Sequence, residues 1–432
     1  MRMADNSSLA FVVPQFPCIS HVFTSNEILG LLANNAKVSI FSCRPSFVIK
    51  PQSLQEFEKP ILPFLVYPSM GNLSLFHMNN CFPGKGKIQS TVKLFLKNCL
   101  SGGASFSDEI IAFCIALNFT TALFNKSIQW IHADFGKGSA NVAWYLSQLS
   151  GIPFSFKIHA FEIFSKEEGV FSRKEQFLRK CQAASKIFAI SRFGLKMLHE
   201  DWGIGLEKLF VQSVGVRLEA LPFVAPRQRS EIPFGIAAIG RLVEKKGFGN
   251  FLESLAILHS KGIQFSAKIF GDGPLKATLL NQAQNLGLAS CVEFFGAFSN
   301  DALPSLLRDV HVLAVPSIID KTGDMDGIPT VIYEGMALGK AVVASKLSGI
   351  PEVVIDGETG VLVPPGDNEA LARALARLYS NEEDLHRLVL RARLFVEKFH
   401  CHKKLGSQLL TTLLNLPHDS GSSDFGTSEK CP

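Results

Sequence analysis

The chain has 432 residues, 47% of them hydrophobic and 19% charged, with a formal net charge of +5. This length favours two domains over one, and the composition is that of a globular protein with enough apolar surface for two cores. The sequence has no dense Lys/Arg run with interleaved aromatic residues, which argues against a nucleic-acid partner.

The positive charge is concentrated in the N-terminal half. Residues 1–215 contain 21 Lys and Arg against 14 Asp and Glu, a net charge of +7, whereas the rest of the chain carries −2. Such an excess is expected where a phosphorylated lipid or an anionic membrane is bound, and it fits lysines scattered over a surface equally well. A peripheral membrane contact is therefore one of two interpretations.

The first half alternates short apolar strands with longer helical segments, the pattern of parallel sheets covered by helices. Its opening run, Leu9–Val13, is too short for the apolar region of a signal peptide and precedes a proline, so it predicts a strand. Further strands are predicted at Val38–Ser42, Trp130–His132, Phe154–His159 and Ile187–Ile190, with helices at Phe23–Ala33 and Ser139–Leu149 and a helix N-cap at Ser191.

Two features of the sequence point to a cytoplasmic protein. The longest apolar stretch, Ile110–Phe124, contains Asn118 and falls short of the ~20 residues that span a bilayer, so we expect a buried helix. The nine cysteines are odd in number and irregular in spacing, and most lie in apolar runs, as expected for buried, reduced thiols.

The alternation is interrupted between Leu218 and Pro233, where prolines and a lack of periodicity predict a linker. A second series follows, with strands predicted at Phe234–Ile239, Ala267–Phe270, Val292–Phe295, His311–Val315, Ala341–Ala344 and Gly360–Val363, and helices at Phe248–Lys261, Leu275–Leu286, Asn368–Tyr379 and Glu382–Phe399.

The predicted fold class is therefore α/β, with two Rossmann-like domains facing across a cleft. The N-terminal domain is placed at 1–217, the linker at 218–233 and the C-terminal domain at 234–417. The last helix of the second domain can return to the first. The Ser/Gly/Asp-rich tail at 418–432 is expected to be disordered.

Glycines and basic residues follow the first two strands of the second series, where ligands bind in open α/β sheets. Gly240 lets a ligand approach the backbone, while Arg241 and Lys246 offer a planar fork and a mobile charge suited to a diphosphate. A solvated basic turn is the alternative interpretation. Gly271 and Gly273 flank an aspartate after the next strand and predict a tight turn near a ligand.

The most informative segment runs from Asp326 to Glu334. Ile328, Pro329 and Thr330 open a helix, and helix N-termini bind anions through free N–H groups. Asp326 precedes this helix and Glu334 lies two turns into it, so both carboxylates can accept hydrogen bonds from sugar and ribose hydroxyls. Taken alone, Asp326 is more simply explained as an N-cap.

Polar segments also follow two strands of the first half. His132 and Asp134 follow one strand, and His159 and Glu162 follow another. A histidine at the carboxyl end of a strand that faces a cleft can hydrogen-bond a hydroxyl near a reacting carbon. Each histidine alone is more often structural, but their shared position favours a site.

Together and in this order, the motifs resemble the large retaining glycosyltransferase family 4, which has the GT-B architecture. The resemblance covers nearly the whole chain and is carried by residues 240–247, 270–274, 326–334, 349–352, 357–360 and 363–367, with Asp326 in place of the first Glu of an E-x7-E motif. The first half is similar to the colanic acid and exopolysaccharide branch at Phe16-Pro17, 131–136 and 159–162. That branch commonly has His at the place of Asp134 and Asp at the place of Glu162.

The resemblance implies transfer of a sugar from a nucleotide-sugar donor to a glycan or lipid-linked acceptor. Four residues would be catalytic: Arg241 and Lys246 would stabilise the leaving diphosphate, His159 would contact the donor sugar and Asp326 would hold its hydroxyls. Further donor contacts would come from Gly240, Gly271, Gly273, Gly327, Ile328, Pro329, Thr330 and Glu334, the last at the ribose. His132, Asp134 and Glu162 would lie on the acceptor side, in the N-terminal domain.

No metal or other cofactor is expected. Asp324 and Asp326 match the D-x-D pair that binds a divalent cation in another glycosyltransferase architecture. Against that interpretation, Arg241 and Lys246 already supply positive charge, and the carboxylates precede a helix late in the chain. The resemblance implies a cytoplasmic, metal-independent hexosyltransferase of exopolysaccharide or cell-surface polysaccharide synthesis.

Other functions on the same architecture stay open. A nucleotide-sugar epimerase is one, and a sugar phosphorylase is another, although no lysine motif for a phosphate or pyridoxal-phosphate site stands out. An inactive nucleotide-sugar-binding subunit is disfavoured by the intact Arg241, Lys246 and Glu334. A dinucleotide oxidoreductase is excluded, because no G-x-G-x-x-G follows the first strand.

Overall fold

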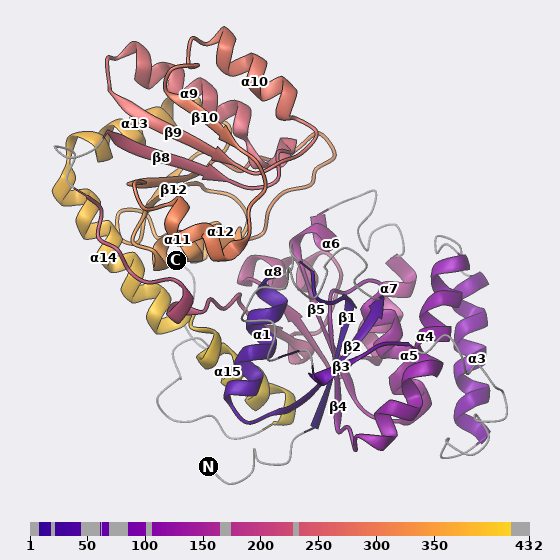
Figure 1. The fold of residues 1–432 in the computed structure, drawn as a ribbon. Helices are drawn as coiled ribbons and strands as arrows, with labels where there is room; N and C mark the ends of the chain where they lie inside the picture. Colours follow the sequence, from indigo (N-terminus) through magenta and orange to yellow (C-terminus); the bar gives the residue numbers. More distant parts are fainter. Residues whose placement is uncertain are drawn as a thin grey trace.

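The computed structural model describes residues 8–18, 22–44, 61, 63–68, 85–100, 106–164, 174–227 and 233–415. They form two parallel sheets, each covered by helices, which occupy the two halves of the molecule in Figure 1. The predicted α/β class with two Rossmann-like domains is confirmed. The predicted disordered tail and residues 228–232 of the predicted linker lie outside the described residues.

The N-terminal sheet has the strand order β3-β2-β1-β4-β5-β6-β7. Apart from the two edge strands, its strands are largely buried on both faces, as parallel strands between two helix layers must be. The order reverses between β1 and β4, so a crevice opens at the carboxyl ends of these strands. The strands are β1 (Ser8–Gln15), β2 (Lys37–Arg44), β3 (Leu65–Val66), β4 (Trp130–Asp134), β5 (Phe154–Ile158), β6 (Lys186–Ala189) and β7 (Leu209–Val211).

The helices of this half are α1 (Val22–Ala33), α3 (Lys85–Leu100), α4 (Phe106–Asn125), α5 (Ser139–Ser150), α6 (Ala160–Phe164), α7 (Lys174–Ala183) and α8 (Arg192–Glu200). The predicted N-cap of α8 is confirmed, because the amide of Gly194 donates to Ser191 Oγ over 3.0 Å. In Figure 1, α3 and α4 form a hairpin at the outer edge of this half.

The long apolar helix α4 is buried on one face only. Among the described helices it alone, at Ser107–Asn125, is long and apolar enough to cross a membrane, and 33% of its most apolar stretch is buried. On its inner face, buried Glu109 accepts hydrogen bonds from Asn141 Nδ2 (3.0 Å) and the Tyr145 hydroxyl (2.6 Å) of α5. The expectation of a buried helix was therefore wrong for the outer face, where Ile111 is 48% exposed.

The C-terminal sheet has the strand order β10-β9-β8-β11-β12-β13, which reverses between β8 and β11. Its strands are β8 (Phe234–Ile239), β9 (Phe265–Phe270), β10 (Val292–Phe295), β11 (Val312–Val315), β12 (Ala341–Ser345) and β13 (Val361–Val363). The helices that cover it are α9 (Phe248–Ser260), α10 (Lys276–Asn285), α11 (Leu303–Leu306), α12 (Thr330–Ala337), α13 (Asn368–Ser380) and α14 (Glu382–Phe399).

The chain crosses between the two halves twice. It leaves the first half after β7 and returns after α14, so that the last described helix, α15 (His402–Leu414), packs against α1 (Figure 1). The crossing segments lie side by side: the amide of Val216 donates to the His400 carbonyl (2.9 Å), and the amide of His402 donates to the Val216 carbonyl (3.1 Å). The two halves are thus joined by a pair of hydrogen-bonded segments.

The cysteines follow their prediction only in part. All seven cysteines in the described residues are free thiols. Cys181 is buried as expected, and the other six are half-buried. Apolar neighbours in the sequence therefore overstated how deeply these side chains lie.

Candidate active site

Residues that the sequence singles out follow the carboxyl ends of strands in both sheets. Gly240 and Arg241 directly follow β8, and the segment that leads to Asp326 follows β11. In the other half, Asp134 ends β4 and His159 directly follows β5. Ligands of open α/β sheets bind at such strand ends, so the topology brings the candidates of each half to one edge of its sheet.

Two lysines on the short 3-10 turn η8 (Glu244–Lys246) pair with the two aspartates of the loop after β11. Lys246 Nζ lies 2.9 Å from Asp326 Oδ2, which also accepts a hydrogen bond from the Ser317 hydroxyl (2.7 Å). Lys245 Nζ lies 2.7 Å from Asp324 Oδ2. The D-x-D carboxylates thus face ammonium groups, and among the described residues no three His, Cys, Asp or Glu side chains are grouped to hold a metal ion.

The helix that follows Asp326 leaves its N-terminus without a side-chain cap. Its first residue is Thr330 and its N-cap is the buried Pro329, so Asp326 is not the N-cap that its position suggested. Ile328 is also buried, and it anchors the loop in the core. The free N–H groups at the start of α12 can bind anionic or hydroxyl oxygens.

Glu334 lies in the second turn of α12, closer to the start of this helix than the sequence suggested, and accepts a hydrogen bond from Asn300 Nδ2 over 3.2 Å. Burial raises the pKa of Glu334 to about 7, an effect that the hydrogen bond from Asn300 only partly offsets. A carboxyl group in this state changes charge near neutral pH. Because only the carboxylate accepts hydrogen bonds from two ribose hydroxyls, its predicted role depends on pH.

Affinity for the nucleoside diphosphate that the sequence predicts as a ligand is expected to increase about tenfold as the pH rises from about 6 to about 8, because burial favours the neutral acid and Glu334 ionises only over this window. Calorimetric titration with nucleoside diphosphates across this range measures the effect. The diphosphate itself also titrates in this range, so Glu334→Gln is the control: its affinity should lack the part of the increase that depends on Glu334. An identical pH dependence in both proteins would contradict the assignment.

The predicted glycines hold two strand-end loops together. A side chain at Gly271, whose φ is +135°, would place its Cβ 1.9 Å from the carbonyl oxygen of Gly240, and one at Gly273 would lie 2.6 Å from that of Leu242. Hydrogen bonds join the same loops, since the amide of Leu242 donates to the Asp272 carbonyl over 2.9 Å. Both glycines are thus required because the loop after β8 and the loop after β9 pack closely against each other. This packing places the backbone of both loops at the carboxyl end of β8.

Of the two cations predicted to bind the diphosphate, Arg241 lies at the surface. Its side chain is exposed, and within the described part of the chain it has no ion-pair partner. Lys246, by contrast, is only 20% exposed and already faces Asp326. The two cations therefore differ: one is positioned by a carboxylate and the other extends into solvent at the end of β8.

The N-terminal candidates belong to a buried charge network. Asp134 Oδ1 lies 2.7 Å from His159 Nε2 and 3.5 Å from Lys157 Nζ, and its other oxygen accepts from the Thr24 hydroxyl. Lys157 also contacts Glu27. Burial alone would raise the pKa of Asp134, but Lys157 and His159 outweigh it and hold that pKa well below the usual range.

The structure buries all three acceptor-side candidates, His132, Asp134 and Glu162, inside the N-terminal half. His132 is fully buried, with Nδ1 2.8 Å from the Ser155 hydroxyl and Nε2 3.5 Å from Glu27. Glu162 accepts hydrogen bonds from the backbone amides of Gly136 (2.8 Å) and Lys137 (2.7 Å). Asp134 is fully buried as well, whereas the side chain of His159 keeps 11% of its surface exposed. Of these candidates, His159 is therefore the one that a ligand could most easily reach.

His159 lies where the two halves meet. Its ring packs against Phe135 and Phe23, with centroids 4.5 and 4.8 Å away. A Cβ added at Gly327, next to Asp326, would lie only 2.8 Å from the Cβ of Ala160, next to His159. The loop between β11 and α12, residues 316–329, is called the donor-side loop below; it is in contact with the His159 segment, as one site formed by both halves requires.

Sequence reasoning missed the partners of the buried charges and the strain beside His159. Lys157 carries a signal, because a lysine in an otherwise apolar, buried strand must pair with a carboxylate. Phe135 has a φ of +74°, a conformation that is unfavourable for a bulky side chain and clusters at functional sites. Nothing in the sequence marks it.

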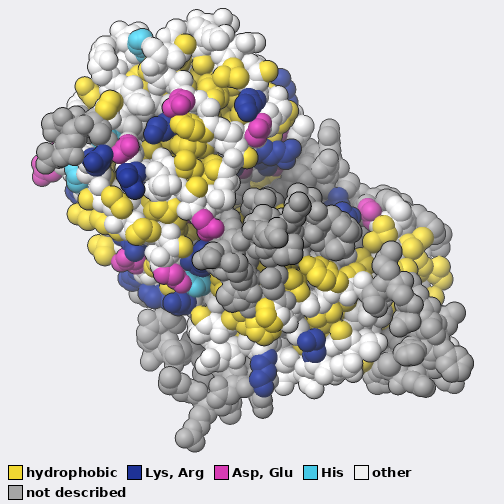
Figure 2. Space-filling model, in the orientation of Figure 1, with side chains coloured by type: hydrophobic (Ala, Val, Ile, Leu, Met, Phe, Trp, Pro, Cys, Tyr) yellow, Lys and Arg dark blue, Asp and Glu magenta, His cyan; other side chains and the backbone are white. Residues whose placement is uncertain are grey.

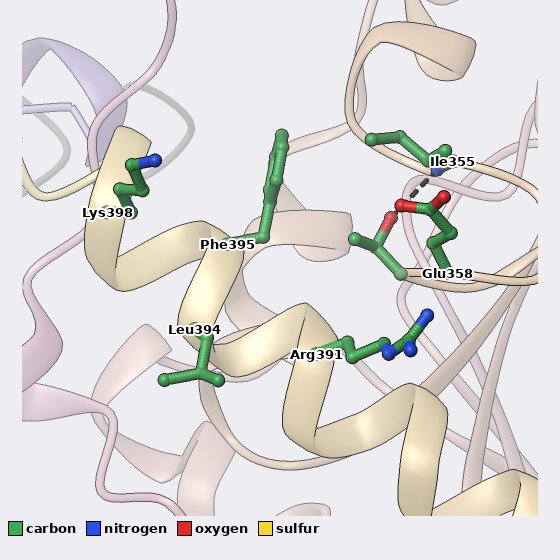
Figure 3. A pocket seen from close by; sticks show the side chains of 7 residues that line it. Ile355, Glu358, Arg391, Leu394, Phe395 and Lys398 are labelled. Carbon is green, nitrogen blue, oxygen red and sulfur yellow. Dashed lines mark hydrogen bonds between the residues drawn. The ribbon is translucent and has the colours of Figure 1, made fainter.

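A shallow cavity of about 270 Å³ lies elsewhere on the C-terminal half. It is lined by the exposed face of α14 and the turn before β13, with Arg391, Phe395 and Lys398 on one side and Ile355 and Glu358 on the other (Figure 3). No predicted site residue lines it, and we assign it no part in the site.

Similar proteins are found by sequence. Residues 226–395 match the family model described as glycosyl transferases group 1. The amylovoran biosynthesis glycosyltransferase AmsK of Erwinia amylovora is 28% identical over 420 residues, which cover 91% of this chain and 96% of that protein. WcaL of Escherichia coli (strain K12), provisionally named a colanic acid biosynthesis glycosyltransferase, is 34% identical over 50% of this chain and 53% of its own length.

Solved structures share the whole fold. The Anabaena Alr3699/HepE structure in complex with UDP superposes with a TM-score of 0.67 over 95% of this chain and 100% of that chain, at 18% identity. A sucrose-phosphate synthase from Thermosynechococcus elongatus gives a TM-score of 0.70 over 95% of this chain and 99% of its own, also at 18% identity. The two-sheet architecture is the GT-B fold.

Proposed function

We propose that this glycosyltransferase, whose residues 226–395 form a domain of the glycosyl transferases group 1 family, moves a hexose from a nucleoside-diphosphate sugar to a glycan or lipid-linked acceptor with retention of configuration. The acceptor belongs to exopolysaccharide or cell-surface polysaccharide synthesis in the cytoplasm. The names of two relatives support this class of product, since they refer to amylovoran and colanic acid. The UDP in a structural neighbour supports the class of donor.

One observation carries the proposal: Lys246 lies 2.9 Å from Asp326 at the strand-order reversal of the sheet, beside the uncapped N-terminus of α12. A diphosphate at this point would meet the ammonium group, the free N–H groups and the exposed Arg241. The carboxylates of Asp326 and Glu334 would accept hydrogen bonds from donor-sugar and ribose hydroxyls. A nucleoside-diphosphate sugar offers phosphates and hydroxyls in this combination.

In the proposed reaction, the bond between the sugar and the diphosphate breaks, and the acceptor hydroxyl attacks the face from which the diphosphate leaves. The proton of that hydroxyl departs with the diphosphate. Negative charge grows on the leaving group, so Lys246 and Arg241 contribute most in the transition state. His159 would contact the donor sugar from the other half, and close packing of the halves excludes water.

A panel of nucleotide sugars tests the function. The thermal unfolding midpoint should rise with one donor and with its free nucleoside diphosphate, because a ligand that binds only the folded state stabilises it. The donor so found is then incubated without acceptor. No shift with any member of the panel would sink the transferase proposal, and epimerised donor would replace it with an epimerase.

Transfer is expected to be independent of divalent metal, because the two carboxylates of the D-x-D sequence already face lysines. Turnover of the identified donor should be the same before and after addition of EDTA. The control is EDTA saturated with magnesium, which corrects for ionic strength. A sharp loss of turnover with EDTA, restored by added Mg²⁺ or Mn²⁺, would assign the aspartates to a metal instead.

The proposal includes a contact with the inner face of an anionic membrane through the α3–α4 hairpin. Glu109 of α4 accepts from Tyr145 of α5 on the inner side of the hairpin, and on its outer side Ile111 is 48% exposed. Val92 and Leu96 are 36% and 50% exposed on α3, a helix with four lysines and no acidic residue. Figure 2 shows hydrophobic side chains over the part of the hairpin that this view exposes.

The protein is expected to float with vesicles of anionic phosphatidylglycerol and to stay unbound with phosphatidylcholine. Lys93 and Lys97 are exposed beside Val92 and Leu96, so Lys93→Glu/Lys97→Glu should lower the bound fraction at least about tenfold, given the ~1 kcal/mol that each cation contributes near such a surface. The control is Lys261→Glu/Lys346→Glu, the same charge change on the other half. Equal loss in both variants would remove the hairpin from the proposal.

A further inference from the structure

One carboxylate of the C-terminal half is bound by the backbone of the N-terminal half. Glu352 ends the 3-10 turn η10 (Ile350–Glu352), shortly after β12. Its two oxygens accept hydrogen bonds from the amides of Arg192 and Phe193, each over 2.8 Å. These are the first two residues of α8, so a single side chain spans the two halves.

The free backbone amides at the N-terminus of α8 are capped by side chains from both halves. The hydroxyl of its own N-cap, Ser191, accepts from the amide of Gly194 (3.0 Å). Glu352 accepts from the two amides that the helix leaves unsatisfied before it. A negative charge here is also favoured by the helix dipole, and hydrogen bonds to a carboxylate are stronger than neutral ones.

The surroundings of Glu352 leave little space between the halves. A Cβ added at Gly349, at the start of the same turn, would lie 2.8 Å from the Cβ of Ser191 and 2.9 Å from the side chain of Ile328. A Cβ added at Gly327 would likewise lie 2.8 Å from Cδ1 of Ile190, which belongs to the other half. The Glu352 turn, the donor-side loop and the β6–α8 junction therefore pack as one contact.

We propose that Glu352 is a positioning residue. Its two hydrogen bonds to the N-terminus of α8, called the clamp below, hold the two halves closed and thereby keep the donor-side loop in contact with the His159 segment. Only the expected effect of Glu352 on turnover rests on the proposed function; the contact between the halves does not. Glu352 itself touches no substrate in this scheme. Loss of the clamp opens the site while leaving the nucleotide contacts of the C-terminal half in place.

The test compares Glu352→Ala with a matched control, Ser191→Ala. Both remove a side-chain cap from the same end of α8, but only the first breaks hydrogen bonds between the halves. Small-angle scattering of the unliganded proteins measures how far the halves separate. Calorimetry with UDP and with GDP measures nucleotide binding, and steady-state kinetics with the donor from the panel separates kcat from KM.

Glu352→Ala is expected to increase the radius of gyration and to lower kcat about tenfold or more, the change that loss of a charge-assisted hydrogen bond produces. Nucleotide affinity should stay within about twofold of wild type. Glu352→Gln keeps one acceptor oxygen, so its radius of gyration and kcat should lie between those of wild type and those of Glu352→Ala. Ser191→Ala should leave the radius of gyration and kcat near wild type.

Two results would overturn the inference. One is a radius of gyration in Glu352→Ala equal to that of wild type, which would show that the carboxylate does not hold the halves together. The other is an equal loss of kcat in Ser191→Ala, which would assign the effect to the stability of α8. Failure of wild type to bind any nucleotide would refute the proposed function, and the scattering comparison would still decide the clamp.

Discussion

Lys246→Ala is expected to lower sugar transfer by about 100- to 1,000-fold, the loss seen when one group that stabilises a developing negative charge is removed. Lys246 Nζ lies 2.9 Å from Asp326 Oδ2. The Lys246 side chain is only 20% exposed, so solvent screens its charge little. The loss should appear in kcat more than in KM. Turnover of the donor from the panel, measured at saturating concentration, checks it.

The neighbouring lysine provides the control for this variant. Lys245 lies on the same turn and pairs with Asp324 over 2.7 Å, so Lys245→Ala removes the same charge from a parallel ion pair. Its turnover should stay within a few-fold of wild type, and both variants should unfold near the wild-type temperature. Retained turnover in Lys246→Ala, or equal losses in the two variants, would refute the role of Lys246 at the diphosphate.

Asp134→Asn is expected to lower the free energy of unfolding of the N-terminal half by about 3 kcal/mol or more, because removing one partner of a buried ion pair leaves the other uncompensated. Asp134 is fully buried between Lys157, His159 and Thr24. Denaturant titration measures the change. Turnover should fall too, since His159 loses the group that orients it.

A surface carboxylate separates this effect from a simple loss of charge. Glu175 is 71% exposed and lies 3.6 Å from Arg179, whose side chain is 15% exposed. Because the carboxylate is in solvent, Glu175→Gln should cost at most about 1 kcal/mol. In wild type the lowered pKa of Asp134 gives stabilisation that is present at neutral pH and is lost as the pH falls below the usual Asp range. An unfolding midpoint in Asp134→Asn equal to that of Glu175→Gln would contradict the buried network.

The strands and helices could be predicted because their signal is local. Runs such as Phe234–Ile239 coincide with β8, and helical spacing at Glu382–Phe399 coincides with α14. The regions of the site could be predicted for a topological reason, since residues that follow parallel strands meet at one edge of the sheet. The pairing of Lys246 with Asp326 is consistent with that expectation. The roles of these residues stay predictions.

The remaining features could not be predicted because they depend on contacts between distant segments. Glu27 and Lys157 are far apart in the sequence, and only the folded sheet brings their charges together. The same holds for Glu352, whose partners belong to the other half. The glycine at position 271 was expected to admit a ligand, but the neighbouring loop already requires it. Local patterns contain no information on such partners.

The return of α15 to the first half has a consequence for synthesis on the ribosome. Leu409, Leu410 and Leu413 are buried in the same cluster as Ile28 and Leu31 of α1, so the N-terminal domain lacks part of its core until α15 has emerged. Domains usually fold in the order in which they are made. Here the first domain to be translated is the last to be completed, and a chain that stops before residue 402 would leave an apolar groove beside α1 uncovered.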